Sequence, residues 1–120
     1  MVSSKVFEIN SDGAAMILAP SRNISSLSED DVQLQWDDIL GRLDGAEIKH
    51  IVFDFEKVNY FGSSMLEAML YLWKRINPEG GKMAVCNVSE TAAEILKLSR
   101  FDTIWPVCDT LKDALDSVNS

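Results

Sequence analysis

The chain has little of what most enzymes and metalloproteins use. Its 120 residues include one histidine, His50, and two cysteines, Cys86 and Cys108. No glycine-rich phosphate loop, nucleophile elbow or set of ligands at metal spacing occurs in the sequence. His50 comes at the start of an apolar stretch, where a structural histidine is more common than a catalytic one. We therefore expect no catalytic activity, no cofactor and no metal site.

Basic residues and long apolar runs are scarce too. Eleven Lys and Arg residues face 19 Asp and Glu, so the net charge is −8. Such a surface repels phosphate backbones and anionic lipids, and we expect no nucleic-acid or membrane partner. No run reaches the roughly 18 apolar residues of a membrane span, and MVSSKVFEIN lacks the apolar core of a signal peptide. Because both cysteines lie in apolar stretches, we expect them to be buried thiols in a cytoplasmic protein.

The hydrophobic pattern predicts five strands and four helices in the order β-β-α-β-α-β-α-β-α. Residues 5–10 and 14–19 predict two strands joined by a turn at Asp12–Gly13. Three further strands are predicted over residues 50–55, 82–88 and 104–107. Alternating strands and helices predict an α/β fold. We expect one domain, 1–120, with a mostly parallel mixed sheet of about five strands, one of them antiparallel, packed by about four helices.

Each predicted helix carries one apolar stripe. The first follows a polar loop in which Ser26 and Glu29 have capping-box spacing, and its inward residues are Val32, Trp36, Ile39, Leu40 and Leu43. The second ends at NPEGG (residues 77–81), and its stripe is Met65, Leu66, Met69, Leu70, Trp73 and Ile76. The third begins at either Ser89 or Thr91. The last has the stripe Leu111, Ala114, Leu115 and Val118.

Two adjacent serines open the second helix, in the stretch YFGSSMLEAML. Ser64 and Glu67 have the S-x-x-E spacing of a capping box, which predicts Ser64 as the N-cap. Ser63 would then lie just outside the helix, close to free N–H groups and the positive end of the helix dipole. A phosphate on Ser63 would add about −1.5 to −2 charges and repel a partner packed there. The alternative is that Ser63 is one more polar loop residue.

Asp54 lies near the end of a predicted central strand, where receiver domains carry their phosphoacceptor. Such domains also need an acidic pair after their first strand and a lysine at the end of a later strand. Asp12 stands alone, and no lysine ends the strand predicted over residues 104–107. We therefore expect Asp54 to make local hydrogen bonds at the strand end.

The succession HIVFDF, EKVNYF, GSSML, an apolar helix and GGKMAVCNVSETAAEILKLSRFDTIWPV resembles the STAS domain. The type members of that family are bacterial anti-sigma factor antagonists, and the resemblance covers almost the whole chain. In the family, a serine kinase that is also an anti-sigma factor phosphorylates the first serine of the pair, which abolishes binding. The resemblance implies that Ser63 is the phosphoacceptor and that the chain regulates transcription by partner switching.

The resemblance also implies partners and a surface that binds them. The partner would be a serine kinase/anti-sigma factor, with a phosphatase as a further partner. The expected partner-binding residues are Asn23, Ser25, Ser26, Tyr60, Gly62, Ser63, Ser64 and Met65. Gly62 and Asn23 stand where the family usually has aspartates, and Met65 stands where it has glycine. The alternative is therefore a STAS module that is not phosphorylated and serves as a scaffold or adapter in a signalling or transport assembly.

Overall fold

The fold is that of a computed structural model, which describes residues 7–21, 29–45 and 47–119. These residues form one mixed sheet with the strand order β1-β2-β3-β4-β5. β1 (Phe7–Asp12) pairs antiparallel with β2 (Ala15–Pro20). β3 (His50–Asp54), β4 (Met83–Cys86) and β5 (Val107–Cys108) continue the sheet in parallel. The predicted class, element order and single antiparallel pair are confirmed.

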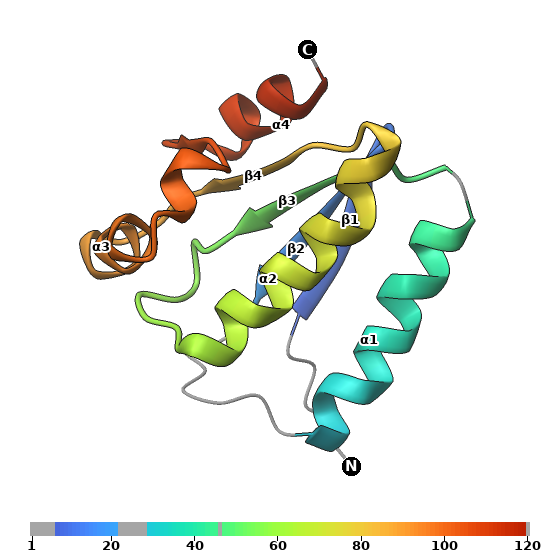
Figure 1. Cartoon of the computed structure of the whole chain (residues 1–120), viewed down its shortest axis with the longest axis horizontal. Helices are drawn as coiled ribbons and strands as arrows, with labels where there is room; N and C mark the ends of the chain where they lie inside the picture. The colour runs from blue at the N-terminus through green and yellow to red at the C-terminus, as the bar shows by residue number, and fades with distance from the viewer. Residues whose placement is uncertain (1–6, 22–28, 46, 120) are drawn as a thin grey trace.

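The helices divide unequally between the two faces of the sheet. They are α1 (Glu29–Asp44), α2 (Ser63–Ile76), α3 (Glu90–Leu98) and α4 (Leu111–Asn119). Residues of α1, α2 and α3 share the larger apolar cluster, whereas α4 packs on the opposite face through a smaller one. Figure 1 shows α2 in front of the sheet, α1 to the right of the sheet and α4 apart from both helices at the top of the view. Short 3₁₀ turns, Asn77–Glu79 and Phe101–Thr103, follow α2 and α3.

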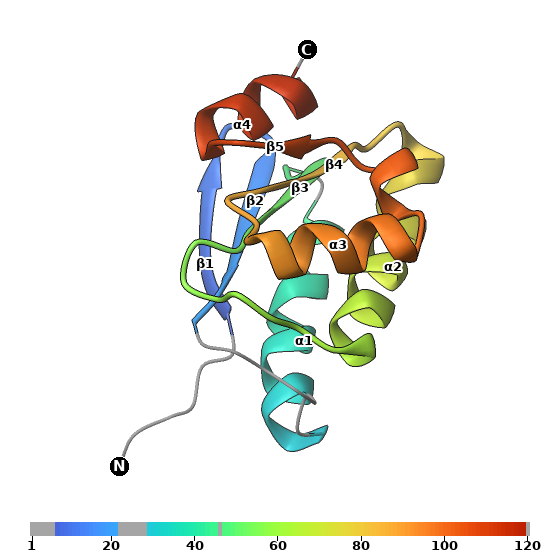
Figure 2. The same ribbon diagram turned by 90° about the vertical axis from the view of Figure 1, so that its left-hand side faces the viewer.

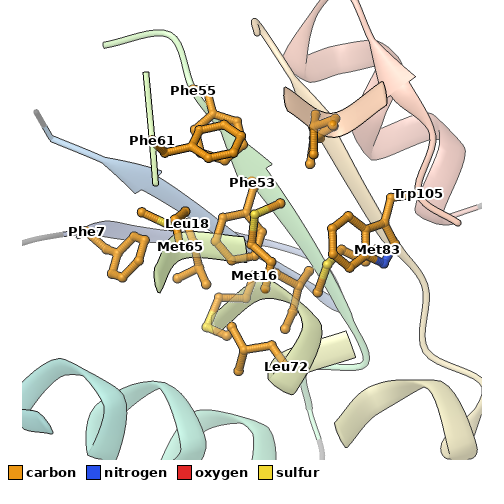
Figure 3. Close-up of a cluster of buried hydrophobic side chains, with 14 of the residues drawn as sticks. Phe7, Met16, Leu18, Phe53, Phe55, Phe61, Met65, Leu72, Met83 and Trp105 are labelled. Carbon is orange, nitrogen blue, oxygen red and sulfur yellow. The ribbon is translucent and has the colours of Figure 1, made fainter. Parts of the chain in front are cut away.

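Alternation along the strands assigns the core residues to the two faces. Phe7, Met16, Leu18, Ile51, Phe53, Met83 and Val85 point to the three-helix face. Ala15, Val52, Ala84 and Cys86 point to α4. The larger side chains therefore fill the space under three helices, and the smaller ones let α4 lie close to the sheet. Figure 3 shows the larger cluster, with Phe53 near its centre.

The strand bounds differ from the predicted ones at several ends. β1 continues to Asp12, and the turn falls at Gly13–Ala14 rather than Asp12–Gly13, because Gly13 takes a φ of 60°, which glycine adopts without penalty. The strands predicted over 50–55 and 82–88 end earlier, at Asp54 and Cys86. The strand predicted over 104–107 is wrong in position.

The last strand begins at Val107 because of the two residues before it. Pro106 has no N–H to donate, although its carbonyl accepts a hydrogen bond from the N–H of Val85 at 2.9 Å. Trp105 turns into the core, 1% exposed, and stacks on Phe101 with ring centroids 4.7 Å apart. Only Val107 and Cys108 are therefore left to pair with β4.

The helix stripes are confirmed where the structure describes them. In α1, Ile39 is buried and Leu40 and Leu43 pack against the core; the side chains of Val32 and Trp36 lie outside the described residues, as does the cap predicted at Ser26. In α2 the fully buried residues are Met65, Met69, Leu72 and Ile76, so Leu72 joins the predicted stripe. α3 begins after Ser89, whose hydroxyl accepts a hydrogen bond from the N–H of Ala92; of the two predicted caps, Ser89 is the one used.

Candidate functional site

The candidate site is the start of α2. Gly62 is the N-cap residue, with extended backbone (φ −101°, ψ −172°), and its carbonyl accepts hydrogen bonds from the N–H groups of Met65 at 3.1 Å and Leu66 at 3.4 Å. Ser63 is therefore the first residue of the helix, and its side chain is exposed. The predicted capping box of Ser64 and Glu67 is wrong, since the N-cap is Gly62, two residues before Ser64, and no side chain caps the helix.

The correction changes what the two serines can do. Ser63, expected just outside the helix, lies within its first turn, and Ser64 follows it, half-buried. No acidic residue lies in that first turn, so within it nothing neutralises the positive end of the helix dipole. Free N–H groups and an uncompensated dipole favour negative charge at Ser63.

Buried side chains hold the connection between β3 and α2, residues 55–62, which leads to Ser63. Phe55, Val58 and Phe61 are all buried, at 6% exposure or less. The rings of Phe55 and Phe61 stack with centroids 4.8 Å apart (Figure 3), and the N–H of Val58 donates to the carbonyl of Phe55 at 3.1 Å. Phe61 is thus fixed in the core directly before Gly62, which sets where the chain turns into α2.

The other expected partner-binding residues divide by exposure. Tyr60 is 43% exposed and Gly62 is half-buried beside Ser63, so these residues share one surface. Met65 is 1% exposed and lies in the core, so its place among the partner-binding residues is corrected: its side chain is not available to a partner. Asn23, Ser25 and Ser26 lie outside the described residues.

Asp54 has a structural role at the end of β3. Its Oδ1 accepts hydrogen bonds from the N–H of Glu56 at 3.1 Å and from Nδ2 of Asn87 at 2.9 Å. The carboxylate therefore holds the first residues after β3 and the first residue after β4. The predicted local hydrogen bonds of Asp54 are confirmed.

Two reactive side chains near this connection, Lys57 and Cys86, also have structural surroundings: one is in an ion pair and the other is buried. Nζ of Lys57 lies 2.9 Å from Oε1 of Glu8, and this hydrogen bond raises the pKa of Lys57. Burial raises the pKa of the Cys86 thiol to about 12, so it remains protonated at neutral pH. Cys86 and Cys108 are both free. Across the described residues, no group of three or more His, Cys, Asp or Glu could hold a metal ion.

The sequence predictions missed Asn87, and they predicted Ser89 as a helix cap without its contact to the connection. Asn87 takes a left-handed backbone conformation (φ 56°) after β4, and Ser89 donates from Oγ to the carbonyl of Asn59 at 2.7 Å. Asn after a strand and Ser before a helix are local signals for such roles. Their partners lie about 30 residues earlier in the chain, and no local pattern indicates those.

The family model of the STAS domain matches residues 7–114, so the chain belongs to the STAS domain family. An anti-sigma F factor antagonist of Paenibacillus polymyxa is 30% identical over 108 residues, which cover 90% of each chain. The structure of an anti-sigma-factor antagonist (STAS) domain protein from Planctomyces limnophilus is similar with a TM-score of 0.76. It is 27% identical, and the likeness covers 95% of this chain and 98% of that one.

A further structure shows the same fold at lower identity. It is that of the anti-sigma factor antagonist SpoIIAA in its unphosphorylated form, 18% identical, with a TM-score of 0.74 over 94% of this chain and 96% of that one. The names of the first two relatives, which are 30% and 27% identical to this chain, describe anti-sigma factor antagonists. The chain is thus an STAS domain of the anti-sigma factor antagonist kind. In the part of the chain that the structure describes, no helix is long and apolar enough to cross a membrane.

Proposed function

We propose that this protein is a cytoplasmic regulator that binds a serine kinase/anti-sigma factor and is switched by phosphorylation at Ser63. The observation that carries the proposal is the exposed hydroxyl of Ser63 on the first residue of α2, at an end of the helix with no acidic residue in its first turn. A kinase can reach this hydroxyl without unfolding the helix. The unphosphorylated form named for one relative supports a phosphorylated counterpart in this fold.

The proposed switch works through charge and bulk at the binding surface. In the unmodified protein, Tyr60 and Ser63 present an aromatic ring and a small hydroxyl to the partner. A phosphate carries about −1.5 to −2 charges and sits where the helix dipole stabilises it within the domain. The same phosphate meets the partner's surface directly, so the fold is kept and the complex is lost. Dephosphorylation by a phosphatase would restore binding.

The test combines a modification assay with a binding assay. The native protein, Ser63→Ala and Ser64→Ala are incubated with the candidate serine kinase/anti-sigma factor, ATP and Mg²⁺, and the phosphorylated residue is located by mass spectrometry. We expect phosphate on the native protein and on Ser64→Ala, the matched control, and none on Ser63→Ala. Ser63→Asp should bind the partner at least tenfold more weakly than Ser63→Ala.

The outcome also separates the two functions considered for this chain. If Ser63→Asp and Ser63→Ala both bind the partner as tightly as the native protein, the switch is refuted. A stable complex without phosphorylation would then favour the scaffold or adapter, which fits the glycine at position 62, where the family usually has an aspartate.

A further inference from the structure

The connection that presents Ser63 is tied to the start of α3 by side-chain hydrogen bonds. The hydroxyl of Ser89 donates to the carbonyl of Asn59 at 2.7 Å and at the same time accepts from the N–H of Ala92 at 3.1 Å. One hydroxyl therefore caps α3 and holds the connection four residues before Ser63. Figure 2 shows this connection, in green, running beside α3 before it enters α2.

A second tie lies at the base of the same connection. Nδ2 of Asn87 donates to Oδ1 of Asp54 at 2.9 Å, and the same oxygen accepts from the N–H of Glu56. Asn87 reaches Asp54 from a left-handed backbone conformation (φ 56°), which asparagine adopts more readily than most residues. The turn between β4 and α3 thus holds the end of β3 at Asp54 and the connection itself at Asn59. We call these two ties, Asn87–Asp54 and Ser89–Asn59, the loop clamp.

The loop clamp acts on the side of the connection that the core does not hold. Phe55, Val58 and Phe61 are buried and anchor the connection from below. Asn59 and Tyr60, between Val58 and Phe61, are exposed. A shallow hollow of about 360 Å³ separates this segment from the turn after β4, with Val58, Asn59, Asn87 and Ser89 among its lining residues. Three of the four residues of the loop clamp therefore line this hollow.

We propose that Ser89 and Asn87 are positioning residues for the Ser63 site, because they hold residues 54–62 in one conformation before a partner binds. A preordered segment loses less conformational freedom on binding, so the clamp raises affinity without touching the partner. The consequence for binding rests on the function proposed for Ser63. The ordering of residues 54–62 by the loop clamp is independent of that function.

Substitutions at Ser89 separate the clamp from the helix cap. Ser89→Thr keeps a hydroxyl that caps α3 and donates to Asn59. Ser89→Asp keeps a good N-cap, since its carboxylate accepts from Ala92, but it has no proton to donate to the Asn59 carbonyl. Thr91→Asp adds the same charge on an exposed residue two positions later and is the matched control.

The first measurement is hydrogen exchange of backbone amides in the protein alone, under native conditions. We expect residues 56–61 to exchange at least fivefold faster in Ser89→Asp than in Ser89→Thr or Thr91→Asp, while the amides of α3 are equally protected in all three. Asn87→Gly keeps the left-handed backbone but lacks the amide, and should speed exchange at Glu56 in the same way. Equal exchange of residues 56–61 in Ser89→Asp and Ser89→Thr would overturn the proposal.

The second measurement is the affinity of each variant for the kinase/anti-sigma factor partner. We expect Ser89→Asp to bind three- to tenfold more weakly than Ser89→Thr and Thr91→Asp, in proportion to the loosening seen by exchange. Loosened amides with unchanged affinity would show that the clamp does not position the site. If instead the native protein neither binds this partner nor is phosphorylated, the proposed function fails, while the exchange experiment still decides whether the clamp orders the connection.

Discussion

The backbone N–H of Lys82, just before β4, donates a hydrogen bond to Nδ1 of His50 on β3 at 3.0 Å. The proton of neutral His50 is therefore on Nε2, and Nδ1 must stay unprotonated for the bond to exist. Burial, followed by the charges of Lys82 and Lys49, lowers the pKa of His50 below 6.5. The structural role expected for the one histidine of the chain is confirmed by this bond.

A pH dependence follows from the lowered pKa of His50. The unfolded chain takes up this proton near pH 6.5 and the folded protein only at lower pH. The contribution of His50 to stability is thus fully present above about pH 6.5 and is lost as the pH falls toward the folded-state pKa. The urea concentration at the unfolding midpoint should therefore fall as the pH is lowered from 7.5 to 5.5. His50→Asn keeps an acceptor near Nδ1 but does not titrate, so its decrease should be smaller; an identical decrease in both proteins would contradict the assignment.

Arg100 is a position where the chain carries backbone strain. It follows α3 with a φ of 62°, and its N–H donates to the carbonyl of Lys97 at 3.0 Å. Glycine adopts this conformation freely, whereas other residues lose about 1 kcal/mol. Arg100→Gly should therefore raise the free energy of unfolding by about 0.5–1 kcal/mol, measured by urea titration.

Lys97→Gly is the control for Arg100→Gly, since it places the same residue inside α3. It should lower the free energy of unfolding by about 1 kcal/mol, because glycine is a poor helix former. The two substitutions thus have opposite predicted signs within four residues. Arg100→Gly and Lys97→Gly proteins that are equally destabilised would show that the left-handed backbone at Arg100 is not strained.

Two glycines make a similar pair that tests packing. A Cβ on Gly81 would lie 2.7 Å from Cβ of Ile76 and 2.8 Å from its carbonyl oxygen, and would also meet the carbonyl of Lys49. Gly81→Ala should therefore destabilise the protein by about 1–3 kcal/mol through overpacking. A Cβ on Gly41, within α1, would meet no atom of the described residues within 4 Å beyond its own helix backbone, so Gly41→Ala should stabilise the protein by about 0.5–1 kcal/mol. Thermal or urea unfolding of both variants measures these changes. A Gly81→Ala protein as stable as the native one would refute the close approach of Gly81 to Ile76 and Lys49.

The order of elements could be predicted because it depends on local periodicity. Alternation in β1 and the apolar stripes of α2 and α4 are properties of short windows, and each window also forms its element in the fold. The position of the last strand was predicted wrongly because Trp105 packs in the core beside Phe101 and does not pair in the sheet. Composition alone does not distinguish these two uses of an apolar residue.

The candidate site was predicted less completely than the fold. Ser63 was correctly predicted to lie at the start of the helix, but the S-x-x-E spacing assigned the cap to Ser64. The start of α2 is instead set by Phe61, buried against Phe55, and by the carbonyl of Gly62, which accepts from two N–H groups. The contact of Ser89 with Asn59 joins residues 30 positions apart, and only the fold brings these residues together.

The position of Ser63 within the first turn of α2 yields a prediction that needs no partner. An acidic side chain in the first turn of a helix is favourable, and α2 has none there. Ser63→Asp should therefore be more stable than the native protein by about 0.3–1 kcal/mol at low ionic strength, and the gain should shrink when salt screens it. Chemical unfolding at two salt concentrations measures both effects.

Ser63→Asn, with nearly the same shape and no charge, is the matched control for Ser63→Asp and should show no salt-dependent gain. The comparison bears directly on the proposed switch. If Ser63→Asp is at least as stable as Ser63→Asn and yet fails to bind the partner, the loss of binding arises at the interface and not from damage to the fold. A Ser63→Asp protein less stable than Ser63→Asn would mean that negative charge is unfavourable at the start of α2, and a phosphate at this position would then disrupt the domain itself.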